Sequence, residues 1–162
     1  MRQCTIPALA LIMLLIAAPP AAAGEDHLLL GTWNVDVSKL EQADPPASVT
    51  MRLSDAGDGG YRLSFDIVTR DGKAVHAGGG IFRPDRSLIS VPGSPEVDAV
   101  TFSMPNRRTL VMGGALAGHP AHTRIWTLAD DGQSMIETIV GHIDGTTPHI
   151  RIALWTRSKP DR

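Results

Sequence analysis

The histidines are the first side chains to consider for chemistry, because imidazole binds metals and titrates near neutral pH. Six occur among the 162 residues, and only His119 and His122 lie close together in sequence. Side chains three positions apart in a strand face opposite sides, so this pair could chelate a metal only from a loop. A zinc site takes three or four ligands, and no aspartate or glutamate lies near the pair. We therefore expect no metal site.

A second pair, His142 and His149, flanks the last predicted hairpin, where the two rings could meet. A histidine in such a position could bind haem, but no aromatic-rich segment accompanies it. The sequence therefore predicts no cofactor.

Motifs for nucleophilic catalysis are absent. No Gly-x-Ser-x-Gly elbow occurs, and Gly78-Gly79-Gly80 precedes a strand-like segment, whereas a phosphate loop leads into a helix. An enzyme on this chain would need an inward polar group such as Glu137 near a histidine. The neighbours of Glu137 are apolar on both faces, so its direction stays open. If it points inward, it must be hydrogen-bonded or have a raised pKa. A non-catalytic role is the better interpretation, and an enzyme is the alternative.

Composition points to one globular domain. The chain is 43% hydrophobic and 20% charged, with a net charge of −2. It is too apolar for a disordered protein. It also lacks the basic surface that nucleic-acid binding requires, so we expect no nucleic-acid partner.

The first 23 residues have the order of a secretory signal peptide. Arg2 precedes an apolar run from Ile6 to Ala18, and a small-residue site at Ala21-Ala22-Ala23 follows. Cleavage near Ala23 would leave residues 24–162 as a single exported domain, periplasmic or secreted. That domain contains no cysteine and no second apolar segment long enough to span a membrane.

The elements that must position any site are short strands. Apolar and polar residues alternate with a period of two in many segments, as in 49–54, 61–67 and 150–154. Turn dipeptides such as Asp58-Gly59 and Asp131-Gly132 separate the segments. The pattern predicts nine or ten antiparallel strands joined mostly to their neighbours, which favours an all-β, up-and-down β-barrel. A two-sheet sandwich is the alternative.

The first predicted strand opens with Gly31-Thr32-Trp33, and Pro45-Pro46, Asp71-Gly72-Lys73 and Val91-Pro92-Gly93 follow in order. In this the chain resembles the small exported lipocalin-like (calycin-type) proteins of bacteria, from about residue 31 to residue 157. The resemblance implies that a basic residue of the last strand, here Arg157, lies across Trp33 as a structural cap on the barrel floor. If Ile150, Ile152 and Leu154 face inward, Arg157 points the other way, so the pairing stays open.

The function implied by the resemblance is non-catalytic binding or carriage of a small apolar molecule inside the barrel. The same inward residues would fill a solid core in a cell-envelope interaction module, and the sequence leaves both alternatives open, as it does the oligomeric state. The candidate lining residues are Met51, Leu53, Leu63, Phe65, Ile67, Phe102, Glu137, Ile152 and Leu154.

Overall fold

A computed structural model describes residues 27–143 and 146–159. The predicted signal peptide, residues 1–23, and its cleavage site near Ala23 lie outside the described residues. No helix within the described ranges is long and apolar enough to cross a membrane.

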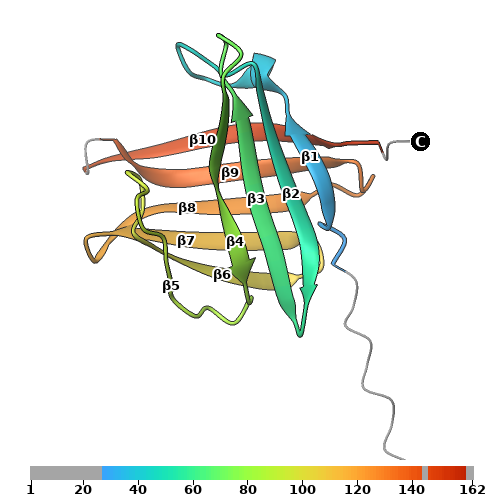
Figure 1. The fold of residues 1–162 in the computed structure, drawn as a ribbon, viewed down its shortest axis with the longest axis vertical. Helices are drawn as coiled ribbons and strands as arrows, with labels where there is room; N and C mark the ends of the chain where they lie inside the picture. Colours follow the sequence, from blue (N-terminus) through green and yellow to red (C-terminus); the bar gives the residue numbers. More distant parts are fainter. Residues whose placement is uncertain (1–26, 144–145, 160–162) are drawn as a thin grey trace, which may run out of the picture.

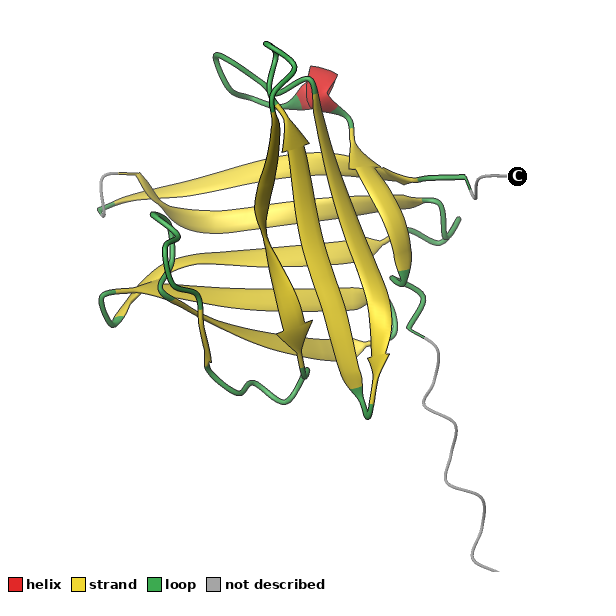
Figure 2. Ribbon diagram, in the orientation of Figure 1, coloured by secondary structure: helices red, strands yellow, loops and turns green. Residues whose placement is uncertain are grey.

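Antiparallel strands make up most of the described chain (Figures 1 and 2). One 3-10 helix, η1, follows the first strand. The elements are, in order, β1 (Gly31–Val35), η1 (Val37–Lys39), β2 (Ser48–Gly57), β3 (Gly60–Val68), β4 (Ala74–Phe82), β5 (Ile89–Ser90), β6 (Ala99–Asn106), β7 (Thr109–Leu116), β8 (His119–Leu128), β9 (Ser134–Ile143) and β10 (Thr147–Arg157).

The ten strands form one sheet in the order β4-β3-β2-β1-β10-β9-β8-β7-β6-β5. Strands that are neighbours in sequence pair with each other, except β4 and β5, which lie at the two edges of the sheet. Because β1 also pairs with β10, the sheet nearly closes into a barrel. Figure 1 shows β1–β4 crossing over β6–β10 as two layers. The predicted all-β, up-and-down antiparallel barrel is therefore confirmed.

Local sequence explains the tight connections. Asp58 and Gly59, which join β2 to β3, have φ values of 51° and 70°. A two-residue hairpin turn of this type needs positive φ at both positions, and aspartate and glycine tolerate it. The turn residues therefore set where these strands begin and end.

The core lies between the two layers and includes Trp33 and Trp126, both fully buried. The prediction for the last strand was wrong in phase: Ala153 and Trp155 point inward, whereas Ile152 and Leu154 are exposed on the outside. Both faces of β10 carry apolar residues, so alternation alone could not choose between them. Burying the indole of Trp155 removes more apolar surface from water than burying one aliphatic side chain does.

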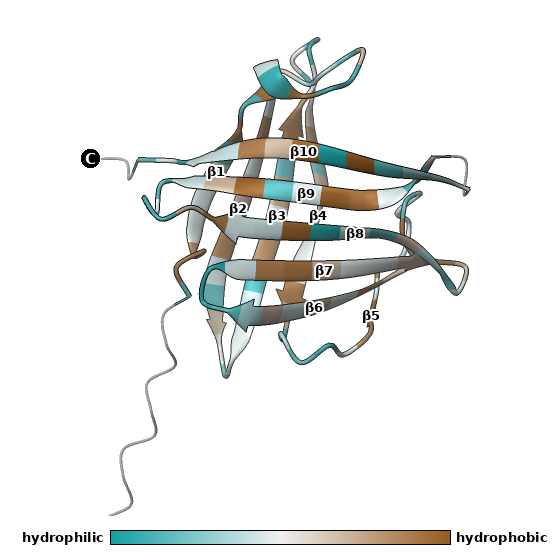
Figure 3. Cartoon of the chain, turned by 180° about the vertical axis from the view of Figure 1, so that it is seen from behind, coloured by the Kyte–Doolittle hydropathy of each residue, from teal (hydrophilic) through white to brown (hydrophobic). Residues whose placement is uncertain are grey.

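The outer surface of β6–β10 carries no charged residue at the positions where these strands are paired with their neighbours. The outer surface of β2–β4, by contrast, carries Arg52, Arg62 and Asp66. We call the first surface the uncharged face, and Figure 3 views it from outside. It consists of Thr101, Ser103, Thr109, Val111, Gly113, Thr123, Ile125, Thr127, Ile136, Thr138, Val140, Ile150, Ile152 and Leu154.

Candidate functional site

One end of the barrel is closed by Arg157 and Trp33. The Arg157 guanidinium carbon lies 4.2 Å from the centre of the Trp33 ring, a cation–π distance. Register explains the contact, because Trp33 pairs with Arg157 across β1 and β10. Arg157 and Trp155 both point inward, because they are two residues apart in β10. The sequence analysis had assigned the inward direction to Ile152 and Leu154, and that assignment pointed Arg157 away from Trp33.

The residues before β1 complete the closed end. Leu29 is fully buried, and its carbonyl accepts a hydrogen bond of 2.9 Å from Nε1 of Trp33. Arg157 donates to the carbonyls of Leu28 and Leu30. A Cβ on Gly31 would lie 2.5 Å from Nη1 of Arg157, and its φ is +140°. Glycine is therefore required at the start of β1, both for its backbone conformation and for the space it leaves to Arg157.

Inward residues of β8, β9 and β10 change in character away from this closed end. Their register forms four rows, which run from the closed end as Leu128–Met135–Trp155, then Trp126–Glu137–Ala153, then Arg124–Ile139–Arg151, then His122–Gly141–His149. The barrel interior is therefore apolar at the closed end and basic toward the other end.

Glu137 lies at the boundary between these two parts and is only 2% exposed. Its Oε2 accepts a hydrogen bond of 3.0 Å from Nε1 of Trp155, and its Oε1 accepts one of 3.2 Å from Nη1 of Arg124. Burial raises the pKa of the Glu137 carboxyl, and the charge of Arg124 opposes that rise. Glu137 thus points into the barrel, one of the two directions that the sequence allowed.

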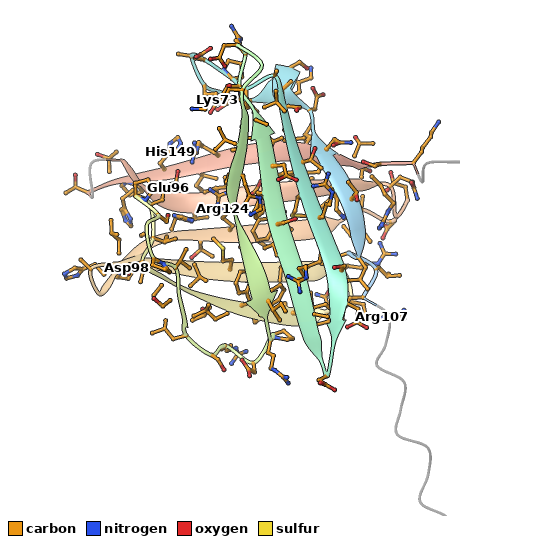
Figure 4. The ribbon with its side chains drawn as sticks, in the orientation of Figure 1. Lys73, Glu96, Asp98, Arg107, Arg124 and His149 are labelled. Carbon is orange, nitrogen blue, oxygen red and sulfur yellow. The ribbon has the colours of Figure 1, made fainter. Side chains whose placement is uncertain are left out.

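Arg124 connects this buried carboxylate to the basic end. Its side chain is 24% exposed, and Nη2 lies 3.5 Å from Oε2 of Glu96, in the segment between β5 and β6. Its Nε donates to Nε2 of His122 at 3.4 Å. Figure 4 shows Glu96, Asp98 and His149 at the end of the β6–β10 layer opposite to Arg107.

Two glycines leave room for the half-buried His122. A Cβ on Gly141 would lie 3.2 Å from Cβ of His122, and one on Gly114 would lie 3.6 Å from its ring. Burial, followed by the charge of Arg124, lowers the pKa of His122. Because the ring stays neutral near pH 7, one of its nitrogens can accept the hydrogen bond from Arg124.

Trp126 provides an unused hydrogen-bond donor. The residue is fully buried, its ring stacks on Phe65 at 6.1 Å between centroids, and its Nε1 has no hydrogen-bond partner among the described residues. An unsatisfied buried donor costs about 1–3 kcal/mol. A ligand atom that accepts from this N–H would remove that cost.

A narrow cleft lies where the segment after η1 covers β9 and β10. Its volume is about 40 Å³, whereas pockets for small organic ligands measure about 300–1,000 Å³. A ligand of that size would therefore require the covering segment to move. The cleft is lined by Leu40, Glu41, Gln42, Ile139, Arg151, Ile152 and Ala153.

The predicted lining residues fall into three groups. Met51, Leu53, Leu63, Phe102 and Glu137 are buried in the interior, and Phe65 and Ile67 are half-buried on the same inner face. Ile152 and Leu154 lie on the outside, for the reason given above. Ile152 is nonetheless one of the residues that line the cleft.

The two histidine pairs do not form sites. β8 begins at His119, so His119 and His122 lie in a strand and not in the loop from which they could chelate a metal. Pro148 lies opposite His142, and Gly141 lies opposite His149, so the second pair does not meet across its hairpin. Within the described ranges, no three histidine, cysteine, aspartate or glutamate side chains are placed to hold a metal ion.

The sequence reasoning did not place Arg124 and Arg151 on the inner face of the barrel, where Arg124 is half-buried and Arg151 is exposed. The signal for Arg124 was present, because it has the same phase as Trp126 and Leu128 in β8. Arg151 could not be identified while β10 was assigned the opposite phase.

Known proteins resemble this chain in structure only. No family model and no curated protein matches it in sequence. The solved structure of wild-type fluorescent protein UnaG aligns with a TM-score of 0.56 at 11% identity, covering 80% of this chain and 97% of UnaG. Fatty-acid-binding protein 1 of Echinococcus granulosus aligns with a TM-score of 0.55 at 12% identity, covering 82% of this chain and 98% of that protein. At such identities the likeness establishes the fold alone, an antiparallel β-barrel.

Proposed function

We propose that this chain is an exported, non-catalytic binding protein that holds a small, mostly apolar molecule in its barrel. The polar end of the molecule would lie among the basic rows of β8 and β10, and its apolar part would lie toward the closed end. The fatty-acid-binding protein that shares this fold is named for such a ligand, and this supports the proposal by analogy.

The interaction between Glu137 and Arg124 is the observation that carries the proposal. A buried ion pair is no more stable than well-packed apolar residues of similar volume. A core whose only role is stability gains nothing from Glu137, Arg124 and an unpaired Trp126 N–H at its centre. Ligand sites, by contrast, combine apolar walls with a few convergent polar groups. Polar groups in this position are therefore best explained by a ligand.

The segment between η1 and β2 is the part that must move for a ligand to enter. Glu41, Gln42, Ala43 and Asp44 are all exposed, and only Leu40 packs against the core. Displacing such a segment sacrifices few buried contacts, so it belongs to the low-stability part of the fold.

Binding is tested by titrating the purified protein with the fluorescent probe 1-anilinonaphthalene-8-sulfonate. We expect saturation at one probe per chain. Arg151→Gln, at the basic end, should weaken binding by about 10-fold, because a hydrogen bond to a charged group contributes about 1.5 kcal/mol or more. Arg62→Gln, on the outer surface of β3, is the matched control and should not change it. Non-saturable binding, or equal binding by both variants, would contradict the proposal.

Native mass spectrometry of protein purified from a bacterial periplasm tests the same proposal without a probe. An extra mass present only under native conditions would be the bound ligand. The same sample tests export, because cleavage after Ala23 would leave Gly24 as the first residue. A chain that keeps its first 23 residues would contradict export.

A second candidate function is that of an interaction module with a filled barrel. The observation that favours it is the cleft volume of only about 40 Å³. A saturable probe and a native-state extra mass would exclude it, and the absence of both would support it.

A further inference from the structure

The uncharged face is unusual for a surface in contact with water. Five adjacent strands, β6–β10, contribute to it, and none of its residues is aspartate, glutamate, lysine or arginine, although 20% of the whole chain is charged. The outer surface of β2 and β3 follows the ordinary rule, with an ion pair between Arg52 and Asp66. The lack of charge is therefore specific to one layer of the barrel.

Large apolar side chains are contiguous on this face. Ile136 lies opposite Leu154 and Val140 lies opposite Ile150 across β9 and β10, with Ile152 between the two pairs. Each of these five side chains is between 40% and 62% exposed. Isolated exposed apolar residues are common, but a contiguous group of this kind marks a surface that binds something.

We propose that a second copy of this chain covers the uncharged face, so that two barrels pack outer sheet to outer sheet in a symmetric dimer. In a two-fold dimer the same patch meets itself and must be self-complementary. A face with no charge of either sign meets that condition, because no ion is desolvated and no like charges are brought together. A charged partner would find no counter-charge there.

The size of the face agrees with this occupant. Neighbouring strands lie about 4.8 Å apart and rise about 3.3 Å per residue, so five strands with about six residues each cover roughly 480 Å² in projection. The accessible surface is larger than the projection because the side chains stand out from the sheet. It therefore approaches the roughly 800 Å² per partner of a standard stable interface. Threonine, valine and isoleucine on both partners can interdigitate as they do between two packed sheets.

Sedimentation velocity of the purified protein over a range of concentrations tests the dimer. We expect the wild type to sediment at twice the mass of the chain at micromolar concentrations. Thr138→Lys places a charge near the middle of the face and should raise the dimer dissociation constant by at least about 100-fold, because the lysine would be buried without a partner. Circular dichroism and thermal unfolding establish that the variant is folded.

Thr50→Lys is the matched control, since Thr50 is a half-buried threonine on the outer surface of β2, in the other layer. It should leave the dimer intact. A wild type that stays monomeric at about 100 µM would overturn the proposal, as would a dimer that resists Thr138→Lys or that both substitutions dissociate. Co-sedimentation of a monomer with phosphatidylcholine vesicles would assign the face to lipid instead. Association that requires residues 1–23 would assign it to the leader.

Discussion

Replacing Arg124 with methionine would leave the carboxylate of Glu137 buried without its cationic partner. Removing one member of a buried ion pair destabilises a protein by about 3–5 kcal/mol. Arg124 is 24% exposed and Trp155 still donates to Glu137, so we expect the lower end of that range, about 3 kcal/mol at pH 7. For a domain of this length that corresponds to a decrease in melting temperature of about 10 °C.

The cost of this substitution should depend on pH, and the sign follows from the raised pKa of Glu137. A carboxyl whose pKa is raised by folding favours the folded state below its unfolded pKa, and that contribution is lost as pH rises through the folded pKa. Without Arg124 the folded pKa rises further. At pH 4 the group is protonated and uncharged, so the cost of Arg124→Met should fall below about 1 kcal/mol.

Urea unfolding at pH 7 and pH 4 measures the effect for the wild type, Arg124→Met, Glu137→Gln and the double variant. The double variant should recover most of the lost stability at pH 7, because a glutamine oxygen still accepts from Trp155 and carries no charge. Arg52→Met is the control, since its partner Asp66 is exposed, and it should cost less than about 1 kcal/mol. Equal costs of Arg124→Met at both pH values, or no recovery in the double variant, would refute the reasoning.

Three further predictions concern single positions. Gly31→Ala should destabilise the fold by about 2 kcal/mol or more, because a Cβ there collides with Arg157 and φ is positive; Gly80→Ala, which meets no atom within 4 Å, should change urea stability little. The lowered pKa of His122 contributes stability that is present above its ordinary pKa of 6.5 and is lost as pH falls, so His122→Gln should flatten the decrease in stability between pH 7 and pH 5. Trp126→Phe removes an unpaired buried N–H and should change the free energy of unfolding by less than about 1.5 kcal/mol, whereas Phe/Trp→Ala truncations in cores cost about 3–5 kcal/mol.

Most of the fold was predictable because its information is local. Alternation with a period of two identifies a strand wherever one face is polar, as in β2, where Arg52 separates Met51 from Leu53. Turn dipeptides such as Asp58-Gly59 fix where hairpins reverse. β5 was missed because a two-residue strand is too short to show any period.

The candidate site was harder to predict because it depends on strand phase. Glu137 is flanked by Ile136 and Thr138, and apolar residues occur on both faces of β9, so alternation does not reveal which face is buried. Only pairing with Trp126 on β8 and Ala153 on β10 places it inside. When a strand is apolar on both faces, the strands with which it pairs decide which face is buried, and the sequence of the strand alone does not.

The phase of β10 links the interior site to the uncharged face. Shifting β10 by one residue would bury Ile152 and Leu154 and would expose Trp155. The same shift would also break the hydrogen bond from Trp155 to Glu137 and the contact of Arg157 with Trp33. A buried polar group satisfied in only one register specifies that register. The hydrogen bond between Glu137 and Trp155 therefore favours the register of β10 in which Ile150 and Ile152 lie outside. The interior site and the exposed apolar face are two consequences of this one register.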